Sequence, residues 1–366
     1  MMEPINLADY EALAVKRLPT PSRDYIQGGS GNQRTLERNC SAFDDIGFRP
    51  RCLVDVSQCD LTTELFGTTL PSPILLAPTG FHGLSHPDGE IETARGAQRD
   101  GTPLVVSTLA SRRLEDIAAA TDSPLWFQVY CSRDRGVTEA LIRRAADAGF
   151  QGLMLTVDTP VLGRRQADER NRFRLPQQAL PQNMLDFVDL EALARPEEAT
   201  SAVTEIVARL FDPTLSWSDL AWLRGLTDLP VVIKGVLEPA DATLAIEHGV
   251  DGIVVSNHGG RQLDGAPATI EALPAIVDAV DGKCPVLFDG GIRRGADVVR
   301  AVALGADAVM IGRPYVWGLA VNGADGVAHV LSLLRRETRE VLALLGCPRL
   351  RDLGPEHVRL PAAWPV

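Results

Sequence analysis

The sequence has few cysteines, no long hydrophobic run and no surplus of positive charge. Its six cysteines are scattered, without C-x-x-C pairs or histidines at zinc spacing, so we expect reduced thiols and no bound metal. No apolar stretch approaches the length that spans a bilayer. Because 36 Lys and Arg oppose 48 Asp and Glu, the net charge is −12. This balance argues against nucleic acid or an anionic membrane as a partner, and any anion site must be local.

Targeting signals are also lacking at the two ends of the sequence. The first fourteen residues, MMEPINLADYEALA, are acidic and predict a helix, not a secretory signal. The last five, AAWPV, are not a peroxisomal address. We therefore expect a cytoplasmic protein. With 366 residues, 45% of them hydrophobic, the chain can bury a large core, and we expect one domain spanning residues 1–366.

What the sequence does contain is a repeated unit of a short apolar strand, a polar loop and an amphipathic helix. The expected strands are residues 74–77, 104–107, 125–130, 153–158, 231–234, 252–256, 286–289 and 308–311. The expected helices between them are residues 88–99, 113–120, 136–148, 239–248, 268–280 and 295–303. Apolar strands that alternate with helices predict a parallel sheet, and eight of them predict a closed (β/α)8 TIM barrel. An open doubly wound sheet is the alternative.

Two regions depart from this repeat. Residues 1–70 predict an N-terminal extension with helices near residues 6–18, 22–26 and 34–43 and strand-like pieces at 51–56. Between residues 163 and 229 no clear strand is found, and residues 166–202 are rich in Arg, Gln, Pro and acidic residues until a helical pattern resumes at 217–226. We expect residues 166–202 to form a long mobile loop after the fourth strand, acting as an active-site lid.

The segment IVVSNHGGRQLD, residues 253–264, is the one around which the rest is organised. An apolar strand ends at Ser256 and is followed by His258, two glycines and Arg261. A base beside a cation, where glycine lets the backbone approach a ligand, suits proton abstraction from an anionic substrate. A local hydrogen bond is the alternative for His258. Asp158, which ends the fourth strand, could orient this imidazole or form a turn before the following proline.

Polar residues follow nearly every expected strand. In barrel enzymes the chemistry lies at the carboxyl ends of the strands, so these residues are candidates for the site. They are Pro78, Thr79, Gly80, Ser107, Gln128, Tyr130, Thr156, Asp158, Lys234, Ser256, His258, Arg261, Asp289, Gly291, Arg293, Gly312 and Arg313. The loops after strands seven and eight combine glycine with arginine, as phosphate sites in barrels do. Lys234 could form a Schiff base, face an electron-rich cofactor ring or pair with a strand-end carboxylate.

Together these motifs resemble the FMN-dependent L-2-hydroxy acid oxidase and dehydrogenase family, which includes glycolate oxidase, lactate oxidase and mandelate dehydrogenase. The most specific motif is SNHGGRQLDGAPAT, residues 256–269. It is supported by LTVDTPVLGRR (155–165), IKG (233–235) and FDGGIRRGADV (288–298). The resemblance covers nearly the whole chain. It implies FMN as cofactor, a 2-hydroxy acid as substrate, O2 or another electron acceptor as second partner, and a homotetramer.

The resemblance also implies a role for each matching residue. His258 is the expected base, and Asp158 the carboxylate that orients it. Tyr130 is expected to face the substrate hydroxyl, and Lys234 to stabilise the reduced flavin. The residues expected to bind the substrate carboxylate are Tyr25, Arg165 and Arg261. Those expected along the flavin ring are Pro78, Thr79, Gly80, Ser107, Gln128, Thr156 and Ser256, and those expected at its phosphate are Asp289, Gly291, Arg293, Gly312 and Arg313.

Two positions depart from the pattern of the glycolate oxidases. Gly80 stands where those enzymes carry alanine, and Leu109 where they carry tryptophan. Both changes remove bulk beside the substrate side chain, so we expect a bulky or aromatic, mandelate-like 2-hydroxy acid as substrate. The lack of a membrane-spanning segment favours O2 as acceptor, giving H2O2. Two alternatives are a dehydrogenase that uses a quinone or carrier protein and an oxidase of lactate or glycolate. The sequence also leaves open whether the substrate reacts by hydride transfer or through a carbanion. A Schiff-base aldolase, a non-redox isomerase and a silent phosphate-binding scaffold remain as other classes.

Overall fold

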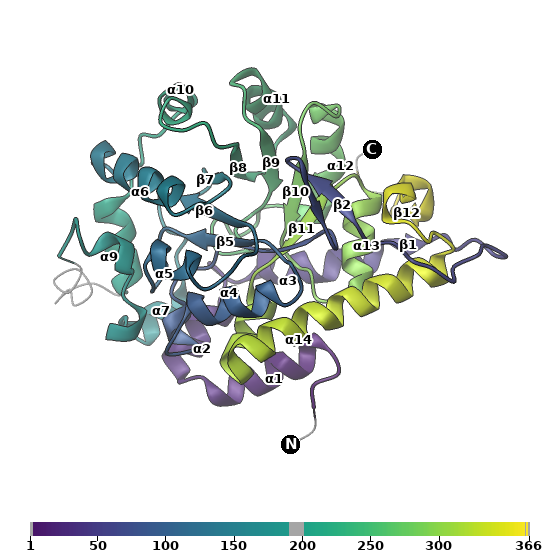
Figure 1. The fold of residues 1–366 in the computed structure, drawn as a ribbon, viewed down its shortest axis with the longest axis horizontal. Coiled ribbons are helices and arrows are strands. Elements are labelled where there is room, and N and C mark those ends of the chain that lie inside the picture. Colours follow the sequence, from purple (N-terminus) through teal and green to yellow (C-terminus); the bar gives the residue numbers. More distant parts are fainter. Residues whose placement is uncertain (1–2, 190–200, 363, 365–366) are drawn as a thin grey trace.

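The structure, a computed structural model, describes residues 3–189, 201–362 and 364 and is built around a closed barrel of eight parallel strands (Figure 1). The strands are β4 (Ile74–Leu76), β5 (Leu104–Ser107), β6 (Leu125–Val129), β7 (Leu153–Thr156), β8 (Val231–Val236), β9 (Gly252–Val255), β10 (Val286–Asp289) and β11 (Ala308–Ile311). They follow one another around the barrel in chain order, and β11 pairs with β4 to close it. The (β/α)8 prediction is confirmed, and the open sheet is ruled out.

Helices cover the outside of the barrel, as the repeated unit predicts. They are α4 (Glu90–Gln98), α5 (Leu114–Ala118), α6 (Arg135–Asp147), α10 (Asp219–Arg224), α11 (Pro239–Glu247), α12 (Thr269–Val280), α13 (Gly295–Ala303) and α14 (Arg313–Leu345). Since the strands are covered on both faces, every residue of β9 is buried and carries no polar alternation. Arg313, expected in a loop after the last strand, is the first residue of α14, which bends at Asn322 and Gly323.

The amino end of the barrel is closed by a hairpin that the sequence analysis missed. Strand β2 (Thr63–Leu65) pairs with β3 (Thr68–Leu70), and Leu65 and Leu70 pack into the barrel interior. The Phe66 ring lies 4.7 Å from the Trp126 ring, centroid to centroid. The prediction of strands at residues 51–56 was wrong: this segment has no partner strand, and Leu53 is fully exposed. Instead β1 (Gly47–Phe48) pairs with β12 (Val358–Arg359).

The N-terminal extension connects the long C-terminal helix to the carboxyl end of the barrel. It contains α1 (Leu7–Arg17), α2 (Thr20–Gln27), α3 (Arg34–Ser41) and the 3-10 turn η1 (Ala42–Asp45). Helix α1 lies beside α14 (Figure 1), with the Tyr10 hydroxyl 2.8 Å from Nδ1 of His329. Near the end of α3, Asn39 exchanges two side-chain hydrogen bonds with Asn257, at 2.8 and 2.7 Å. These bonds tie the extension to the loop that carries His258.

The segment expected to form the lid begins with ordered short helices. They are α7 (Gln166–Arg170), η3 (Gln177–Ala179) and η4 (Gln182–Met184), and α9 (Ala202–Leu210) follows the segment. Phe173 and Asn183 are buried and hold this part against the barrel. Residues 190–200 of the expected lid lie outside the described residues, and its mobility stays a prediction. The chain ends with the turns η5 (Leu350–Asp352) and η6 (Pro355–His357) before β12.

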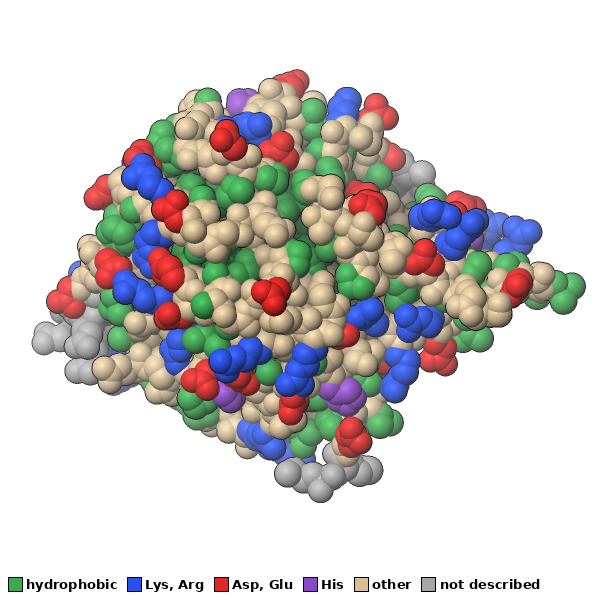
Figure 2. All heavy atoms as spheres, viewed as in Figure 1, with side chains coloured by type: hydrophobic (Ala, Val, Ile, Leu, Met, Phe, Trp, Pro, Cys, Tyr) green, Lys and Arg blue, Asp and Glu red, His purple; other side chains and the backbone are tan. Residues whose placement is uncertain are grey.

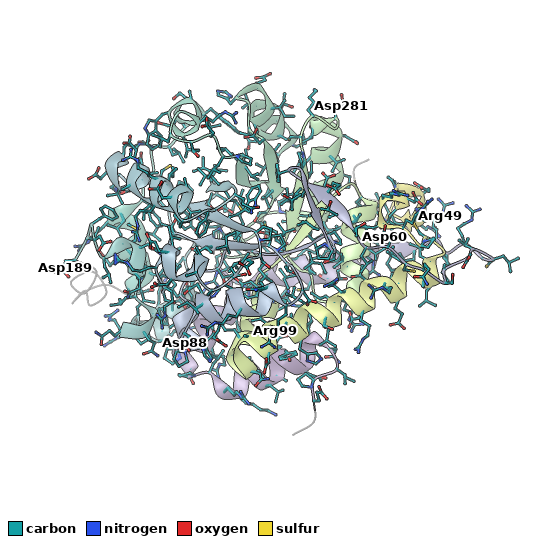
Figure 3. The ribbon with its side chains drawn as sticks, in the orientation of Figure 1. Arg49, Asp60, Asp88, Arg99, Asp189 and Asp281 are labelled. Carbon is teal, nitrogen blue, oxygen red and sulfur yellow. The ribbon has the colours of Figure 1, made fainter. Side chains whose placement is uncertain are left out.

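The charged groups of this acidic chain are spread over its surface. The face in Figure 2 shows acidic and basic side chains interspersed, and the labelled residues in Figure 3, such as Asp281 and Arg49, lie at the periphery. In the ranges that the structure describes, no helix has both the length and the apolar character needed to cross a membrane. The buried charges, by contrast, gather at the carboxyl end of the barrel.

Candidate active site

A cavity opens at the carboxyl ends of the barrel strands. It brings together residues of the extension, of the loops after seven of the eight barrel strands and of α9. The sequence-predicted residues that line it are Tyr25, Pro78, Thr79, Gly80, Ser107, Leu109, Tyr130, Arg165, Lys234, His258, Arg261, Asp289, Gly291, Arg293, Gly312 and Arg313. Residues nearly 300 positions apart in the chain thus share one cavity.

His258 and Asp158 form a part-buried pair at the carboxyl ends of β9 and β7. Nδ1 of His258 lies 2.9 Å from Oδ1 of Asp158, so the ring can donate Nδ1–H to the carboxylate and keep its Nε2 lone pair. Burial lowers the pKa of His258, and Lys234 adds to this effect, while Asp158 opposes it. Burial resists ionisation of Asp158, but His258 and Lys234 hold its pKa below the ordinary value. The pair therefore presents a neutral imidazole beside a carboxylate that can stabilise its protonated form.

Nε2 of His258 points toward Tyr130. This nitrogen lies 3.4 Å from the Tyr130 hydroxyl oxygen. The Tyr130 ring stacks on the Phe211 ring at a centroid distance of 4.5 Å. Burial, reinforced by Asp158, raises the pKa of Tyr130, so the phenol stays protonated. The site therefore holds one proton acceptor and one hydroxyl donor side by side.

Two arginines flank the ring of Tyr25 in α2. The guanidinium carbon of Arg261 lies 4.9 Å from the ring centroid and that of Arg165 lies 5.5 Å from it. Burial, together with the nearby Arg165, lowers the pKa of Arg261 to about 10. Nε and Nη1 of Arg165 are buried and have no hydrogen-bond partner among the described residues. Buried donors of this kind are costly unless an anion accepts from them, so this part of the cavity suits a carboxylate.

Lys234 lies in β8 beneath the cavity and pairs with a strand-end carboxylate, one of the three possibilities left open above. Its Nζ is 3.2 Å from Oδ2 of Asp289 and 3.0 Å from the hydroxyl of Ser256. Ser256 in turn donates to Oδ1 of Asp289 at 2.6 Å. Because Lys234 and Asp289 both line the cavity, the ion pair leaves the ammonium group available to a ligand.

The far end of the cavity is formed by the loop after β10 and the start of α14. Gly290 and Gly291 have φ angles of 106° and 85°, and a Cβ on Gly291 would lie 1.9 Å from the carbonyl oxygen of Asn39. Arg293 and Arg313 stand beside this loop, and Arg313 also starts a helix, whose amino end attracts anions. Burial, with the neighbouring Arg261 and Arg293, lowers the pKa of Arg313. An anion bound here would relieve that repulsion.

Three residues predicted to touch the cofactor are not among those that line the cavity: Gln128, Thr156 and Ser256. Gln128 accepts hydrogen bonds from the Ser107 hydroxyl and from the amide of Thr108, both at 3.2 Å, and donates to the Thr156 hydroxyl at 3.0 Å. These residues therefore form a buried polar layer directly beneath Ser107. Their contact with a cofactor stays a prediction.

The model of the family of FMN-dependent dehydrogenases matches residues 14–360. The chain belongs to this family, and FMN is its cofactor. An L-lactate oxidase from Nostoc sp. is 48% identical over 98% of each chain. A peroxisomal (S)-2-hydroxyacid oxidase from Arabidopsis thaliana is 45% identical over 97% of this chain and 96% of its own. A crystal structure of mandelate oxidase with (S)-4-hydroxymandelic acid is 42% identical, covers 97% of this chain and 98% of its own, and superposes with a TM-score of 0.92.

The chemistry of the cavity fits FMN. One end offers the paired glycines with Arg293 and Arg313 for a phosphate, and the middle offers the Lys234 ammonium to an electron-rich ring. The donors of Arg165 that have no partner among the described residues line the same cavity and can bind a second anion. A phosphate at Arg293 and Arg313 and a second anion at Arg165 would both meet positive charge, although the protein as a whole is acidic.

Other lining residues were missed by the sequence analysis. The apolar ones include Leu162, Val203 and Val207. The last two belong to α9, whose apolar residues recur at helical spacing, a signal that predicts a buried face but not what that face covers. His82 was also missed: it is buried and hydrogen-bonds through Nε2 to the Thr79 hydroxyl at 2.6 Å. It supports the loop that follows β4.

Proposed function

We propose that this enzyme oxidises (S)-2-hydroxy acids with a bulky, apolar side chain to 2-oxo acids. The observation that carries the proposal is that His258, held by Asp158, lines the same cavity as Arg165, whose Nε and Nη1 have no hydrogen-bond partner among the described residues. A base and an anion site on one cavity suit a substrate that carries both a carboxylate and an acidic proton. Two electrons and two protons leave the substrate, and O2 takes them up as H2O2.

The substrate carboxylate binds between Arg165 and Arg261, with the Tyr25 hydroxyl as a further donor. Guanidinium groups bind a carboxylate through two parallel hydrogen bonds, a geometry that fixes the orientation of the substrate. Two backbone carbonyls, those of Tyr25 and Gly28, hold Nη1 of Arg261 at 2.9 and 2.7 Å. This anchoring leaves the rest of the guanidinium free to face the substrate.

His258 accepts a proton from the bound substrate through Nε2, and Asp158 stabilises the imidazolium that results. The hydroxyl of Tyr130, 3.4 Å from Nε2, donates to the substrate oxygen and keeps it beside the base. All three side chains are part-buried, which limits the competition of water for these hydrogen bonds. The positions of the three residues support roles that we propose here and that measurement must test.

FMN supplies the two-electron acceptor when it is bound. Arg293, Arg313 and the glycine loop after β10 would hold its phosphate, and the backbone of residues 78–80 with Ser107 would lie along its ring. Lys234 would face the part of the ring that gains negative charge, while Asp289 keeps the ammonium group in place. Gln128, Thr156 and Ser256 would position these groups from below.

The shape of the cavity supports a large apolar substituent on the substrate. Gly80 and Leu109 both line it, and a Cβ on Gly80 would lie 3.1 Å from Cβ of Leu109. Leu162, Val203 and Val207 extend the apolar wall. The structural match with a mandelate oxidase bound to (S)-4-hydroxymandelic acid agrees with an aromatic substrate. Lactate is the second candidate, since the L-lactate oxidase of Nostoc sp. is 48% identical.

A visible spectrum of the purified protein tests the proposal. Under anaerobic conditions, (S)-mandelate should bleach the flavin band, and readmitted air should restore it with formation of H2O2. Bleaching without rapid recovery would replace O2 by another electron acceptor. A flavin that lactate bleaches far faster than mandelate would favour the second candidate. Both a cytoplasmic location and a homotetramer belong to the proposal, and light scattering of the purified enzyme tests the latter.

A further inference from the structure

Two arginine–carboxylate pairs lie one residue apart at the start of the segment after β7. Arg164 and Glu169 form an exposed pair at 2.9 Å, in which 75% of the Arg164 side chain is accessible. Arg165 and Asp168 form a buried pair, with side chains only 5% and 3% exposed, whose charged atoms are 4.0 Å apart. The outer pair is an ordinary surface ion pair, whereas Arg165 of the inner pair lines the proposed substrate site.

The inner pair is incomplete. Nε and Nη1 of Arg165 and Oδ2 of Asp168 are buried and have no hydrogen-bond partner in the part of the chain that the structure describes. At 4.0 Å the two charges attract one another without forming a hydrogen bond. A packing role alone does not require a buried carboxylate and guanidinium at this separation, because such a pair costs desolvation that packing does not return. Arg165 is thus held by charge while its donors remain available to an anion in the cavity.

Asp168 also balances the charge of the site. Burial raises its pKa, and the attraction of Arg165 and Arg261 opposes this rise, so both guanidinium groups act on this one carboxylate. Counted over Arg165, Arg261 and Asp168 alone, two positive charges and one negative charge leave a net charge of +1 at the proposed site of the substrate carboxylate. A monoanion brings the sum to zero, whereas a dianion leaves an uncompensated negative charge in a buried site.

We propose that Asp168 is a positioning residue that selects monoanionic substrates, because it holds Arg165 in place and cancels one of the two positive charges that face the substrate. Asp168 does not line the cavity and acts through Arg165. The inference rests on the proposed function, which places the substrate carboxylate at Arg165 and Arg261. It adds selection by charge to the selection by size that the apolar wall provides. Without Asp168, a substrate whose long side chain carries a second carboxylate could enter the cavity.

Binding measurements on the FMN-loaded enzyme test this role without turnover. The dissociation constants of oxalate, a dianion, and acetate, a monoanion, are measured from changes in the flavin spectrum. Asp168→Asn should raise the affinity for oxalate relative to acetate by roughly tenfold or more, since the buried negative charge beside Arg165 is removed. Glu169→Gln is the matched control on the same helix and should leave the ratio within about twofold, because its partner Arg164 is exposed. An unchanged ratio in a folded, FMN-bound Asp168→Asn variant would overturn the proposal.

Turnover supplies the second readout. The ratio of kcat/KM for (S)-malate to that for (S)-2-hydroxypentanoate, similar in length but different in charge, should rise by a similar factor in Asp168→Asn. Asp168→Glu keeps the charge and should keep the wild-type ratio, whereas a merely structural role would make both variants lose activity on both substrates alike. If the wild-type enzyme oxidises neither acid nor mandelate, the proposed function fails, while the binding ratio still decides the role of Asp168.

A second variant covers the case in which Asp168→Asn does not fold. Arg165→Met/Asp168→Asn removes both buried charges, so no unpaired charge is left behind. If this double variant folds and binds FMN where the single variant does not, Asp168 is the counter-ion of Arg165, as proposed. If the double variant fails as well, Asp168 serves the fold and not the charge of the site, and the proposal is wrong.

Discussion

His258 and Asp158 lie 100 residues apart in the chain, yet their Nδ1 and Oδ1 atoms meet at 2.9 Å. The backbone of His258 adopts φ of 59°, a conformation that non-glycine residues rarely take. Its amide donates to the Ser256 hydroxyl at 3.1 Å, and the loop is tied to the extension through Asn257 and Asn39. The imidazole is therefore placed by contacts on both sides of the loop, which suits a catalytic group more than a surface turn.

Replacing His258 by Gln should lower kcat by at least ~10³-fold, because glutamine cannot accept the substrate proton. The variant should still bind FMN, since the phosphate loop is separate. Anaerobic bleaching by (S)-mandelate in a stopped-flow instrument measures the effect. His248→Gln, at the exposed end of α11, is the control and should behave as wild type. Rapid bleaching in His258→Gln would remove this residue as the base.

Replacing Asp158 by Asn should change both the rate and its pH dependence. The base must be neutral, so kcat/KM rises with pH through the pKa of His258, which burial already holds below its ordinary value. Asp158 raises that pKa, and its loss should therefore shift the rising limb to lower pH. At the same time kcat should fall by roughly 10²–10⁴-fold, because the imidazolium loses its counter-charge. Profiles from about pH 5 to about pH 8 check the direction, and a shift to higher pH would contradict this account.

Much of the barrel follows from local patterns in the sequence. Runs such as Leu104–Ser107 are apolar without alternation, and helices lie between them, so a covered parallel sheet is the only arrangement that buries them. In a closed parallel barrel all strands end on one face. Residues as distant as Lys234 and Arg293 therefore fall into one site once the strands are known.

Features that depend on tertiary contacts could not be predicted in this way. The hairpin of β2 and β3 is short, and its apolar residues Leu65 and Leu70 pack into the barrel interior. This packing partner cannot be recognised from the local sequence. Arg165 and Asp168 form a buried pair, whereas Arg164 and Glu169 form an exposed one. The sequence spacing of the two pairs is similar, so it could not show which pair is buried. The resemblance to a family supplied the roles of Tyr25 and Arg165, which lie outside the strand-end pattern.

The contact between the extension and the phosphate loop should make Gly291 essential. In Gly291→Ala the new Cβ would lie 1.9 Å from the Asn39 carbonyl oxygen, and φ of 85° would be strained as well. Either α3 or the loop must move, so FMN should bind at least ~10-fold more weakly and the free energy of unfolding should fall by more than ~2 kcal/mol. Gly282→Ala is the control: φ is 68° there, but nothing lies within 4 Å of the new Cβ. Equal losses in both variants would show that backbone strain alone matters.

The ion pair beneath the cavity should make Lys234 important for stability as well as for the flavin. Lys234→Met leaves Asp289 buried with only the Ser256 hydroxyl as partner among the contacts described above, which should cost ~3–5 kcal/mol of unfolding free energy. Lys234→Met/Asp289→Asn removes the stranded charge and should recover part of this loss. Both variants should have a lower flavin midpoint potential, since neither keeps the ammonium group. Urea unfolding without FMN measures the stability and a redox titration of the FMN-loaded enzyme measures the midpoint potential. A double variant less stable than the single one would contradict the pairing.

The side-chain pocket should narrow in Gly80→Ala. The backbone at Gly80 is not in the left-handed region, so alanine fits the chain, but its Cβ would lie 3.1 Å from Cβ of Leu109 and 3.7 Å from the Ser107 hydroxyl. Because Gly80 and Leu109 both line the cavity, the added methyl group takes room from the substrate side chain and not from the carboxylate site. The ratio of kcat/KM for (S)-mandelate to that for glycolate should therefore fall by roughly tenfold, the scale of one methyl group in a pocket.

Leu109→Trp should lower the same ratio further, and Gly282→Ala, in a surface turn, should leave it unchanged. A uniform loss on both substrates would mean that Gly80→Ala disturbs the flavin instead of the pocket. A wild-type enzyme that already prefers glycolate would show that the room opposite Leu109 does not set the substrate.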